Sequence, residues 1–156
     1  EGLLRNATRE QVNAIENKDI YILQEQLSGN VFTVDYVRNA HTAHDAAVPR
    51  QELLRTKNGA GLTVQMIADP ALIKLVSYIG NKLNINGCVN MEFILNNGKY
   101  YLIDINPRFS AGVAFSVVEG YNMVLNHIRC FAGEEVDPQI DIKEQIIIKK
   151  YEEVIY

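Results

Sequence analysis

Apolar and polar residues alternate through much of the chain, and this pattern predicts strands that are joined in hairpins. Strands are expected at residues 20–27, 31–37, 48–54, 62–67, 87–95 and 99–105, and residues 145–156 are expected to form a terminal strand or hairpin. The first two strands are expected to pair around turn residues 28–30, and residues 39–47 are expected to form a polar loop.

Helical signals separate these strands. Thr8 with Gln11 has the spacing of a capping box and predicts a short helix to about residue 17. Asp69 followed by Pro70 begins a second helix, which is expected to end near residue 84. After a loop at residues 107–112, a third helical pattern runs to about residue 131 and is closed by Gly133. This order predicts an α+β fold, with a largely antiparallel sheet and flanking helices.

Composition narrows the class of protein. The 156 residues fit one domain, with 47% apolar and 22% charged residues and no apolar run near the ~18 residues of a membrane span. The net charge of −4 without a basic cluster argues against a nucleic-acid groove. Cys88 and Cys130 belong to no CxxC pair, which favours reduced thiols and a cytoplasmic setting.

The strands at 87–95 and 99–105 carry acidic residues whose relative position can be worked out. The odd positions from Val89 to Leu95 and from Tyr101 to Ile105 are apolar, whereas the even positions include polar residues of both strands, so odd residues are expected to pair with odd ones. A three-residue loop, 96–98, satisfies this rule and is expected to place Asn90 opposite Asp104. Glu92 then lies opposite Leu102. Glu92 and Asp104 become diagonal neighbours on one face, roughly 7–8 Å apart.

Oxygen ligands on one face of a sheet suggest a site for a hard cation. Two carboxylates this close repel each other unless a cation lies between them, and Asn106 continues the same face. Such ligands suit Mg²⁺ or Mn²⁺. Arg108 follows after Pro107 and offers a planar fork for phosphate or carboxylate. A solvated polar face would carry similar residues, and spacing alone does not choose between the two interpretations.

Residues 87–112, GCVNMEFILNNGKYYLIDINPRFSAG, resemble the metal-binding hairpin of ATP-grasp enzymes. The similarity is strongest to carbamoyl-phosphate synthetase large-chain-like proteins and more remote to biotin carboxylase. It implies that Glu92, Asp104 and Asn106 bind Mg²⁺ (or Mn²⁺), with Asp104 where members usually have Glu. It also implies that Arg108 contacts the transferred phosphate or the substrate, as the catalytic residue.

Two further segments resemble the same family. Residues 22–37, ILQEQLSGNVFTVDYV, are similar to its interdomain linker and the following strand, although Val31 stands where many members have a ribose-binding Glu. Residues 48–61, VPRQELLRTKNGAG, resemble its strand of basic residues near phosphate and substrate, with Arg55 as one candidate. The nucleotide-binding residues that the resemblance implies are Gln24, Glu25, Gln26, Leu27, Ile94, Lys57 and Arg50.

The resemblance implies that residues 1–156 form the C-terminal lobe of an ATP-grasp domain. Family members also have an upstream substrate domain and a small lobe with a glycine-rich loop, of which Glu1-Gly2 is expected to be the tail. The parent protein is expected to be an ATP- and Mg²⁺-dependent carboxylate–amine or carboxylate–ammonia ligase that acts through an acyl-phosphate. This chain alone is then expected to be inactive and to bind ATP weakly.

Other functions stay open at this point. Val31 favours a degenerate, non-catalytic nucleotide-binding or assembly module, and a plain α+β interaction domain is a third option. The expected partners are ATP, a small carboxylate, an amine or ammonia acceptor and, as one option, a second copy of the chain. Nucleic acid and membranes are not expected partners.

Overall fold

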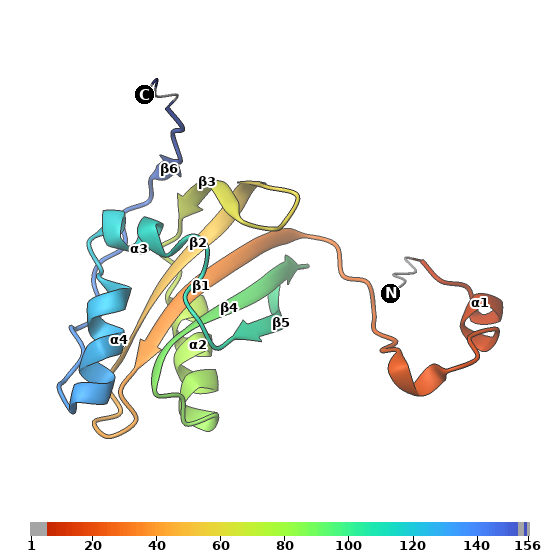
Figure 1. Ribbon diagram of the computed structural model, residues 1–156, viewed down its shortest axis with the longest axis horizontal. Coiled ribbons are helices and arrows are strands. Elements are labelled where there is room, and N and C mark those ends of the chain that lie inside the picture. The colour runs from red at the N-terminus through yellow and green to blue at the C-terminus, as the bar shows by residue number, and fades with distance from the viewer. Residues whose placement is uncertain (1–5, 153–154, 156) are drawn as a thin grey trace.

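The computed structural model describes residues 6–152 and residue 155. Its sheet has six strands in the order β5-β4-β1-β2-β3-β6, and every paired neighbour is antiparallel (Figure 1). The predicted α+β class with an antiparallel sheet is therefore confirmed. The elements are α1 (Arg9–Asn13), η1 (Lys18–Ile20), β1 (Asn30–Arg38), β2 (Asp45–Arg55), β3 (Gly61–Met66), α2 (Pro70–Lys82), β4 (Gly87–Asn96), β5 (Lys99–Asn106), α3 (Val113–Glu119), α4 (Met123–Ala132) and β6 (Ile146–Ile148).

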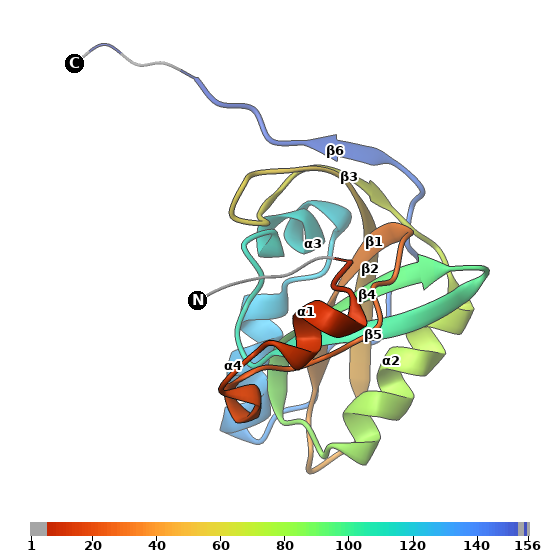
Figure 2. The same cartoon turned by 90° about the vertical axis from the view of Figure 1, so that its right-hand side faces the viewer.

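Helices cover both faces of the sheet (Figures 1 and 2). On one face α2 packs Leu72 and Val76 against the even residues of β1, among them Val34. On the other face α3 and α4 pack Phe115 and Met123 against the opposite side chains of the same strands. Because neighbouring residues of a strand point to opposite faces, each strand contributes to both cores. In the part of the chain that the structure describes, no helix is long and apolar enough to cross a membrane.

The amino-terminal arm differs from the prediction. Residues 21–28 form no strand, and both edges of β1 are already occupied by β2 and β4, so the expected first hairpin is wrong. Ile22 is 89% exposed and Leu23 76% exposed, so the arm has no core to pack against. The capping box of Thr8 is present, yet α1 buries no residue and ends at Asn13 instead of near residue 17. Glu1-Gly2 lies outside the described residues.

Most other elements lie close to their predicted positions. The Asp69 side chain caps α2 by accepting from the backbone N–H of Ala71 at 2.8 Å. β2 begins at Asp45, inside the predicted polar loop, because it pairs with the whole end of β1. At the C-terminal end, the described residues include only the short strand β6, which pairs with β3.

The third predicted helix is two helices. Gly120 ends α3 in the left-handed conformation, with φ of 109°, which favours glycine. The Asn122 side chain then caps α4 by accepting from the N–H of Leu125 at 3.0 Å. Gly133 closes α4 with φ of 74°, as expected from the sequence.

The β4–β5 hairpin keeps the predicted shared face for Glu92 and Asp104 with a different register, whereas the β5 residues nearest the turn lie on the face opposite to the predicted one. The turn has two residues, Asn97 and Gly98, both with positive φ, because Asn96 pairs with Lys99. A bulge at Ile103 then shifts the register by one residue. Glu92 therefore lies directly opposite Asp104, and the expected pairing of Glu92 with Leu102 is wrong. The pairing of Asn90 also changes, from the expected Asp104 to Asn106.

Candidate active site

The sheet face under α3 and α4 is apolar at one end and polar at the other. Val37 and Val48 belong to the apolar core. Toward the other end of β1, Asp35 stands between Val48 and Asn90 of the neighbouring strands, and Thr33 stands between Arg50 and Glu92. Directly opposite side chains lie about 4.5–5.5 Å apart at Cβ. The polar residues among them therefore form one continuous polar patch, which consists of Thr33, Asp35, Arg50, Asn90 and Glu92.

A buried ion pair holds the patch together. The Arg50 guanidinium is 1% exposed and the Asp35 carboxylate 0% exposed, and Arg50 Nη1 donates to Asp35 Oδ2 at 2.8 Å. The Ser116 hydroxyl of α3 donates to the same oxygen at 2.7 Å. Arg50 Nη2 donates to Ser110 Oγ at 3.0 Å. The network thus ties β1 and β2 to the loop between β5 and α3.

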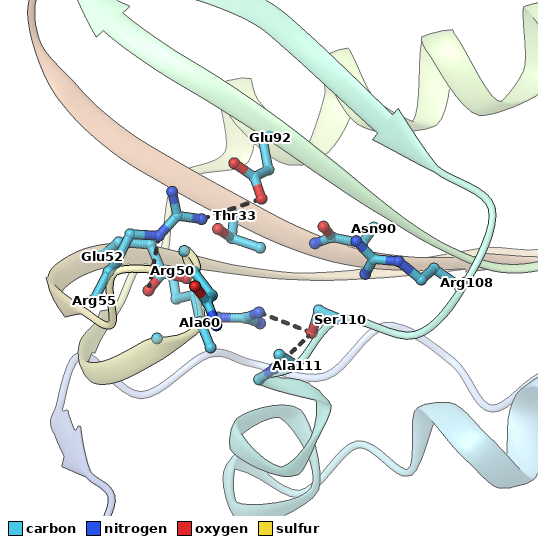
Figure 3. Close-up of a pocket in the computed structure, with 14 residues that line it drawn as sticks. Thr33, Arg50, Glu52, Arg55, Ala60, Asn90, Glu92, Arg108, Ser110 and Ala111 are labelled. Carbon is cyan, nitrogen blue, oxygen red and sulfur yellow. Dashed lines mark hydrogen bonds and ion pairs between the residues drawn. The ribbon is translucent and has the colours of Figure 1, made fainter. Parts of the chain in front are cut away.

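Above this network lies a cleft of about 310 Å³ (Figure 3). Three elements form its walls: the sheet, the turn between β2 and β3, and the loop that carries Arg108. In Figure 3 the side chains of Arg55, Glu92 and Arg108 reach the cleft from β2, β4 and this loop. The lining residues are Thr33, Arg50, Glu52, Arg55, Asn58, Gly59, Ala60, Gly61, Asn90, Glu92, Arg108, Ser110, Ala111 and Gly112.

Charges of both signs line the cleft. Arg55 Nη2 lies 3.1 Å from Glu92 Oε1, and both side chains are about a quarter exposed, at 26% and 23%. Glu52 is 2% exposed, and its Oε1 accepts from Arg50 Nε at 3.3 Å. The cleft therefore has acidic groups that attract a cation and guanidinium groups that attract an anion.

Several buried polar atoms of the cleft have no hydrogen-bond partner in the protein. Leaving such an atom unpaired costs about 1–3 kcal/mol, so natural proteins keep few of them. In the described part of the chain all of these buried side-chain atoms belong to the patch or the cleft wall: Thr33 Oγ1, Asp35 Oδ1, Glu52 Oε2, Arg55 Nε and Asn90 Nδ2. Their concentration in one place points to a binding site rather than to a core that is merely polar.

Oxygen donors from β4 and β5 meet at the rim of the cleft. Asp104 lies opposite Glu92 on the same face of the sheet. Asn106 Nδ2 donates to Asp104 Oδ2 at 2.8 Å, and Asn106 Oδ1 accepts from Arg108 Nη2 at 3.2 Å. Carboxylate and amide oxygens are the donors that Mg²⁺ and Mn²⁺ prefer, so this set fits such an ion chemically.

The structure brings together only some of the residues singled out in the sequence. Glu92, Arg108 and Arg50 line the cleft, and Asp104 and Asn106 lie beside it on β5 and at its end. Ile94 follows on the same strand face as Glu92 and is half-buried. Lys57 is exposed in the β2–β3 turn outside the lining, and the arm residues Gln24, Glu25, Gln26 and Leu27 are outside it too.

The sequence interpretation missed part of the site. Thr33, Asp35 and Asn90 belong to strands that were recognised, and Asp35 and Asn90 interrupt otherwise apolar runs. A polar residue at a core-facing position is the signal that could have found them. Ser110 and Glu52 carry no comparable signal, because only the folded chain brings them against Arg50.

Comparison with known proteins identifies the family to which the chain is similar. Residues 17–154 match a family described as "ATP-grasp in the biosynthetic pathway with Ter operon". The chain is 33% identical to the carbamoyl phosphate synthase large chain of Thermoplasma acidophilum over 111 residues, which is 67% of this chain and 10% of that protein. It is 28% identical to the large chain of Clostridium perfringens over 137 residues, or 80% of this chain and 13% of that protein. The chain thus spans about a tenth of the length of these relatives.

Solved structures share the fold. The biotin carboxylase domain of Hydrogenobacter thermophilus 2-oxoglutarate carboxylase, determined as a dimer with MgADP, ADP and bicarbonate, has a TM-score of 0.61 at 20% identity, over 75% of this chain and 28% of that one. The phosphoribosylaminoimidazole carboxylase ATPase subunit of Aquifex aeolicus has a TM-score of 0.59 at 14% identity, over 70% and 36%. Identities this low show the fold alone, whereas the family match covers most of the chain. The chain belongs to the ATP-grasp family.

Proposed function

We propose that this chain is the C-terminal lobe of an ATP-grasp ligase and provides the metal- and phosphate-binding side of its active site. The observation that carries the proposal is the pairing of Glu92 with Asp104 on one face of the β4–β5 hairpin, at the rim of a cleft that Arg108 also lines. The relatives named carbamoyl phosphate synthase and the MgADP complex of a family fold support this choice.

Each residue of the rim has a proposed role. Glu92, Asp104 and Asn106 bind Mg²⁺ or Mn²⁺, which supplies charge neutralisation for the phosphates of ATP when it is bound. Arg108 is the catalytic residue, because its guanidinium can stabilise the negative charge that develops on the phosphoryl group during transfer. Asn106 Oδ1 accepts from Arg108 Nη2 at 3.2 Å and keeps a second lone pair for a cation, so the proposed ligand and the proposed catalytic residue are in direct contact.

The nucleotide is proposed to lie between the sheet rim and the amino-terminal arm. Val31 pairs with Ile94, so the arm leaves the sheet beside the residue expected under the adenine. Gln24, Glu25, Gln26 and Leu27 of the arm are the proposed adenine contacts, and Lys57 of the exposed turn is a proposed phosphate contact. Arg50 acts indirectly, since its donors bind Asp35, Glu52 and Ser110 and fix the loop next to Arg108.

The proposed reaction is the activation of a small carboxylate by ATP. The carboxylate attacks the terminal phosphorus, an acyl-phosphate forms and ADP leaves. An amine or ammonia then attacks the acyl carbon and releases phosphate. The chain's own contribution is to position the phosphates and to neutralise charge, so no side-chain nucleophile is needed.

The test uses the complete protein that contains this lobe. Glu92→Gln combined with Asp104→Asn is expected to abolish Mg²⁺-dependent ADP release. Asp141→Asn combined with Glu144→Gln removes the same two charges from exposed positions and serves as the matched control. Near-normal turnover in the first variant would refute the metal assignment.

Calorimetry separates a ligase from a degenerate nucleotide-binding module. ATP is titrated into the same protein with and without Mg²⁺. A ligase site is expected to gain affinity with Mg²⁺, and this gain should disappear in the Glu92→Gln, Asp104→Asn variant. An ATP affinity that is the same with and without Mg²⁺ would favour the degenerate module. Val31 supports that alternative, because it stands where many family members have a ribose-binding Glu.

A further inference from the structure

Arg55 stands between two carboxylates that belong to different parts of the cleft. Its Nη2 contacts Glu92 Oε1 at 3.1 Å, and its Nε lies 3.8 Å from Glu52 Oε2. The first contact has hydrogen-bond length, whereas the second is too long for one. Arg55 therefore forms a hydrogen-bonded ion pair with Glu92 and lies next to Glu52 without a hydrogen bond to it.

The atoms of the second, longer contact are both unsatisfied. Arg55 Nε and Glu52 Oε2 are buried and have no hydrogen-bond partner in the protein. The Glu52 carboxylate cannot easily turn to solvent, because Arg50 holds its other oxygen and Gly61 closes over Oε2. A Cβ atom on Gly61 would lie only 2.5 Å from that oxygen. A small movement of the guanidinium toward Glu52 would pair both atoms.

We propose that Arg55 is a positioning residue that occupies the cation site through Glu92 and transfers its guanidinium to Glu52 when a divalent cation binds. This inference rests on the proposed function in one respect, namely that Glu92 is a cation ligand. It goes further because it names Arg55 as the group that competes with the cation for Glu92. It also names the buried Glu52 carboxylate as the acceptor of the Arg55 guanidinium. Arg55 thereby keeps Glu92 paired while the cation is absent.

Electrostatics gives the direction of the exchange. A divalent cation on Glu92 repels a guanidinium a few ångströms away, and that repulsion is strong near a partly buried surface. Glu52 offers a carboxylate that is almost fully buried, where an ion pair is less screened than at the exposed rim. Removal of Arg55 should therefore strengthen cation binding, and removal of the Glu52 charge should weaken it.

The experiment measures Mn²⁺ affinity from the electron paramagnetic resonance signal of free Mn²⁺, on the full chain. Arg55→Ala is expected to bind Mn²⁺ about 2- to 5-fold more tightly than wild type, which is the upper part of the range for loss of one partly exposed ion pair. Lys74→Gln, on α2 of the opposite face, loses the same charge and is expected to change the affinity less than about 2-fold. Unchanged or weaker binding by Arg55→Ala would overturn the proposal.

A double-mutant cycle tests the acceptor. Glu52→Gln is expected to weaken Mn²⁺ binding about 3-fold in wild type and to have no effect in the Arg55→Ala background. An equal effect in both backgrounds would mean that Glu52 acts on the cation directly, and it would overturn the transfer. Glu52→Gln keeps an amide oxygen for Arg50, so the variant retains that contact.

Nuclear magnetic resonance gives a readout that does not depend on affinity. The Nε–H signal of Arg55, assigned by its loss in Arg55→Lys, is expected to shift during a Mg²⁺ titration as Nε acquires Glu52 as its acceptor. The shift should be absent in Glu52→Gln. A signal that stays in place at saturating Mg²⁺ would overturn the transfer.

The two proposals fail in different ways. If Glu92→Gln with Asp104→Asn leaves Mn²⁺ affinity unchanged, the cation is bound elsewhere and the proposed function loses its metal site. If that double variant abolishes binding while Arg55→Ala behaves like wild type, the metal site stands and only the role of Arg55 is refuted.

Discussion

Replacement of Asp35 by alanine tests whether the buried ion pair holds the site in place. Asp35→Ala removes a fully buried carboxylate and leaves the Arg50 guanidinium, 1% exposed, without its 2.8 Å partner. Loss of one member of a buried pair costs about 3–5 kcal/mol, mostly because the other charge stays desolvated. The Glu52 carboxylate remains 3.3 Å from Arg50 Nε and offsets part of this cost, so we expect the lower end, about 3 kcal/mol.

The assay is urea unfolding followed by far-ultraviolet circular dichroism, since the chain has no tryptophan. A loss of about 3 kcal/mol in the free energy of unfolding corresponds to a fall in Tm of roughly 6–12 °C for a chain of this size. Ser110→Ala removes one neutral acceptor of the buried Arg50 guanidinium and should cost about 1.5–3 kcal/mol.

The matched control is an exposed contact between a histidine and a carboxylate. His44 and Glu135 lie 3.5 Å apart with side chains 60% and 66% exposed, so Glu135→Gln should change stability by less than about 0.5 kcal/mol. If Asp35→Ala costs no more than this control, the pair does not stabilise the fold. Our account of how Arg50 fixes the Arg108 loop would then be wrong.

Two further predictions concern parts of the fold away from the cleft. Gly80→Ala should cost about 1–3 kcal/mol in urea unfolding, because its Cβ would lie 2.2 Å from the hydroxyl of the buried Tyr36; unchanged stability would contradict the packing of α2. Hydrogen bonds from Asn126 and Arg129 lower the pKa of Asp137, so its contribution to stability is present above the ordinary carboxyl range and disappears as pH falls through the lowered pKa. Asp137→Asn should therefore make Tm decrease less steeply as the pH is lowered below about pH 4. The same decrease of Tm in the variant and the wild type would refute this.

The sequence could predict that Glu92 and Asp104 share a face of the β4–β5 hairpin, but it could not predict the register or the faces of the β5 residues nearest the turn, where Phe93 pairs with Leu102. Glu92 and Asp104 share a face in any pairing that joins even residues with even ones, so apolar alternation was sufficient. The two-residue Asn97-Gly98 turn pairs even residues with odd ones, and the bulge at Ile103 restores the pairing of even with even from Glu92 and Asp104 onward. Nothing in the local sequence marks the bulge, because Ile103 is an ordinary apolar strand residue.

The predicted first hairpin is wrong because strand pairing depends on residues far apart in the chain. Residues 20–27 have the composition of a strand, yet β2 and β4 occupy both edges of β1. The basic strand resembled one that contacts phosphate, and sequence alone could not show that Arg50 is buried against Asp35. Burial and edge occupancy are properties of the assembled sheet, so local patterns do not contain them.

The burial of the polar patch bears on the choice between a binding site and a solvated sheet face. A solvated face would leave its polar side chains in water, whereas Thr33, Asp35 and Asn90 are at most 2% exposed. Their positions pack beside Val37 and Val48, where apolar residues would fold at lower cost. Unpaired polar atoms in such a place weaken the fold, and proteins retain them where a ligand completes their hydrogen bonds. Burial therefore argues against a solvated sheet face for these three residues, and we propose that the patch contributes to a binding site.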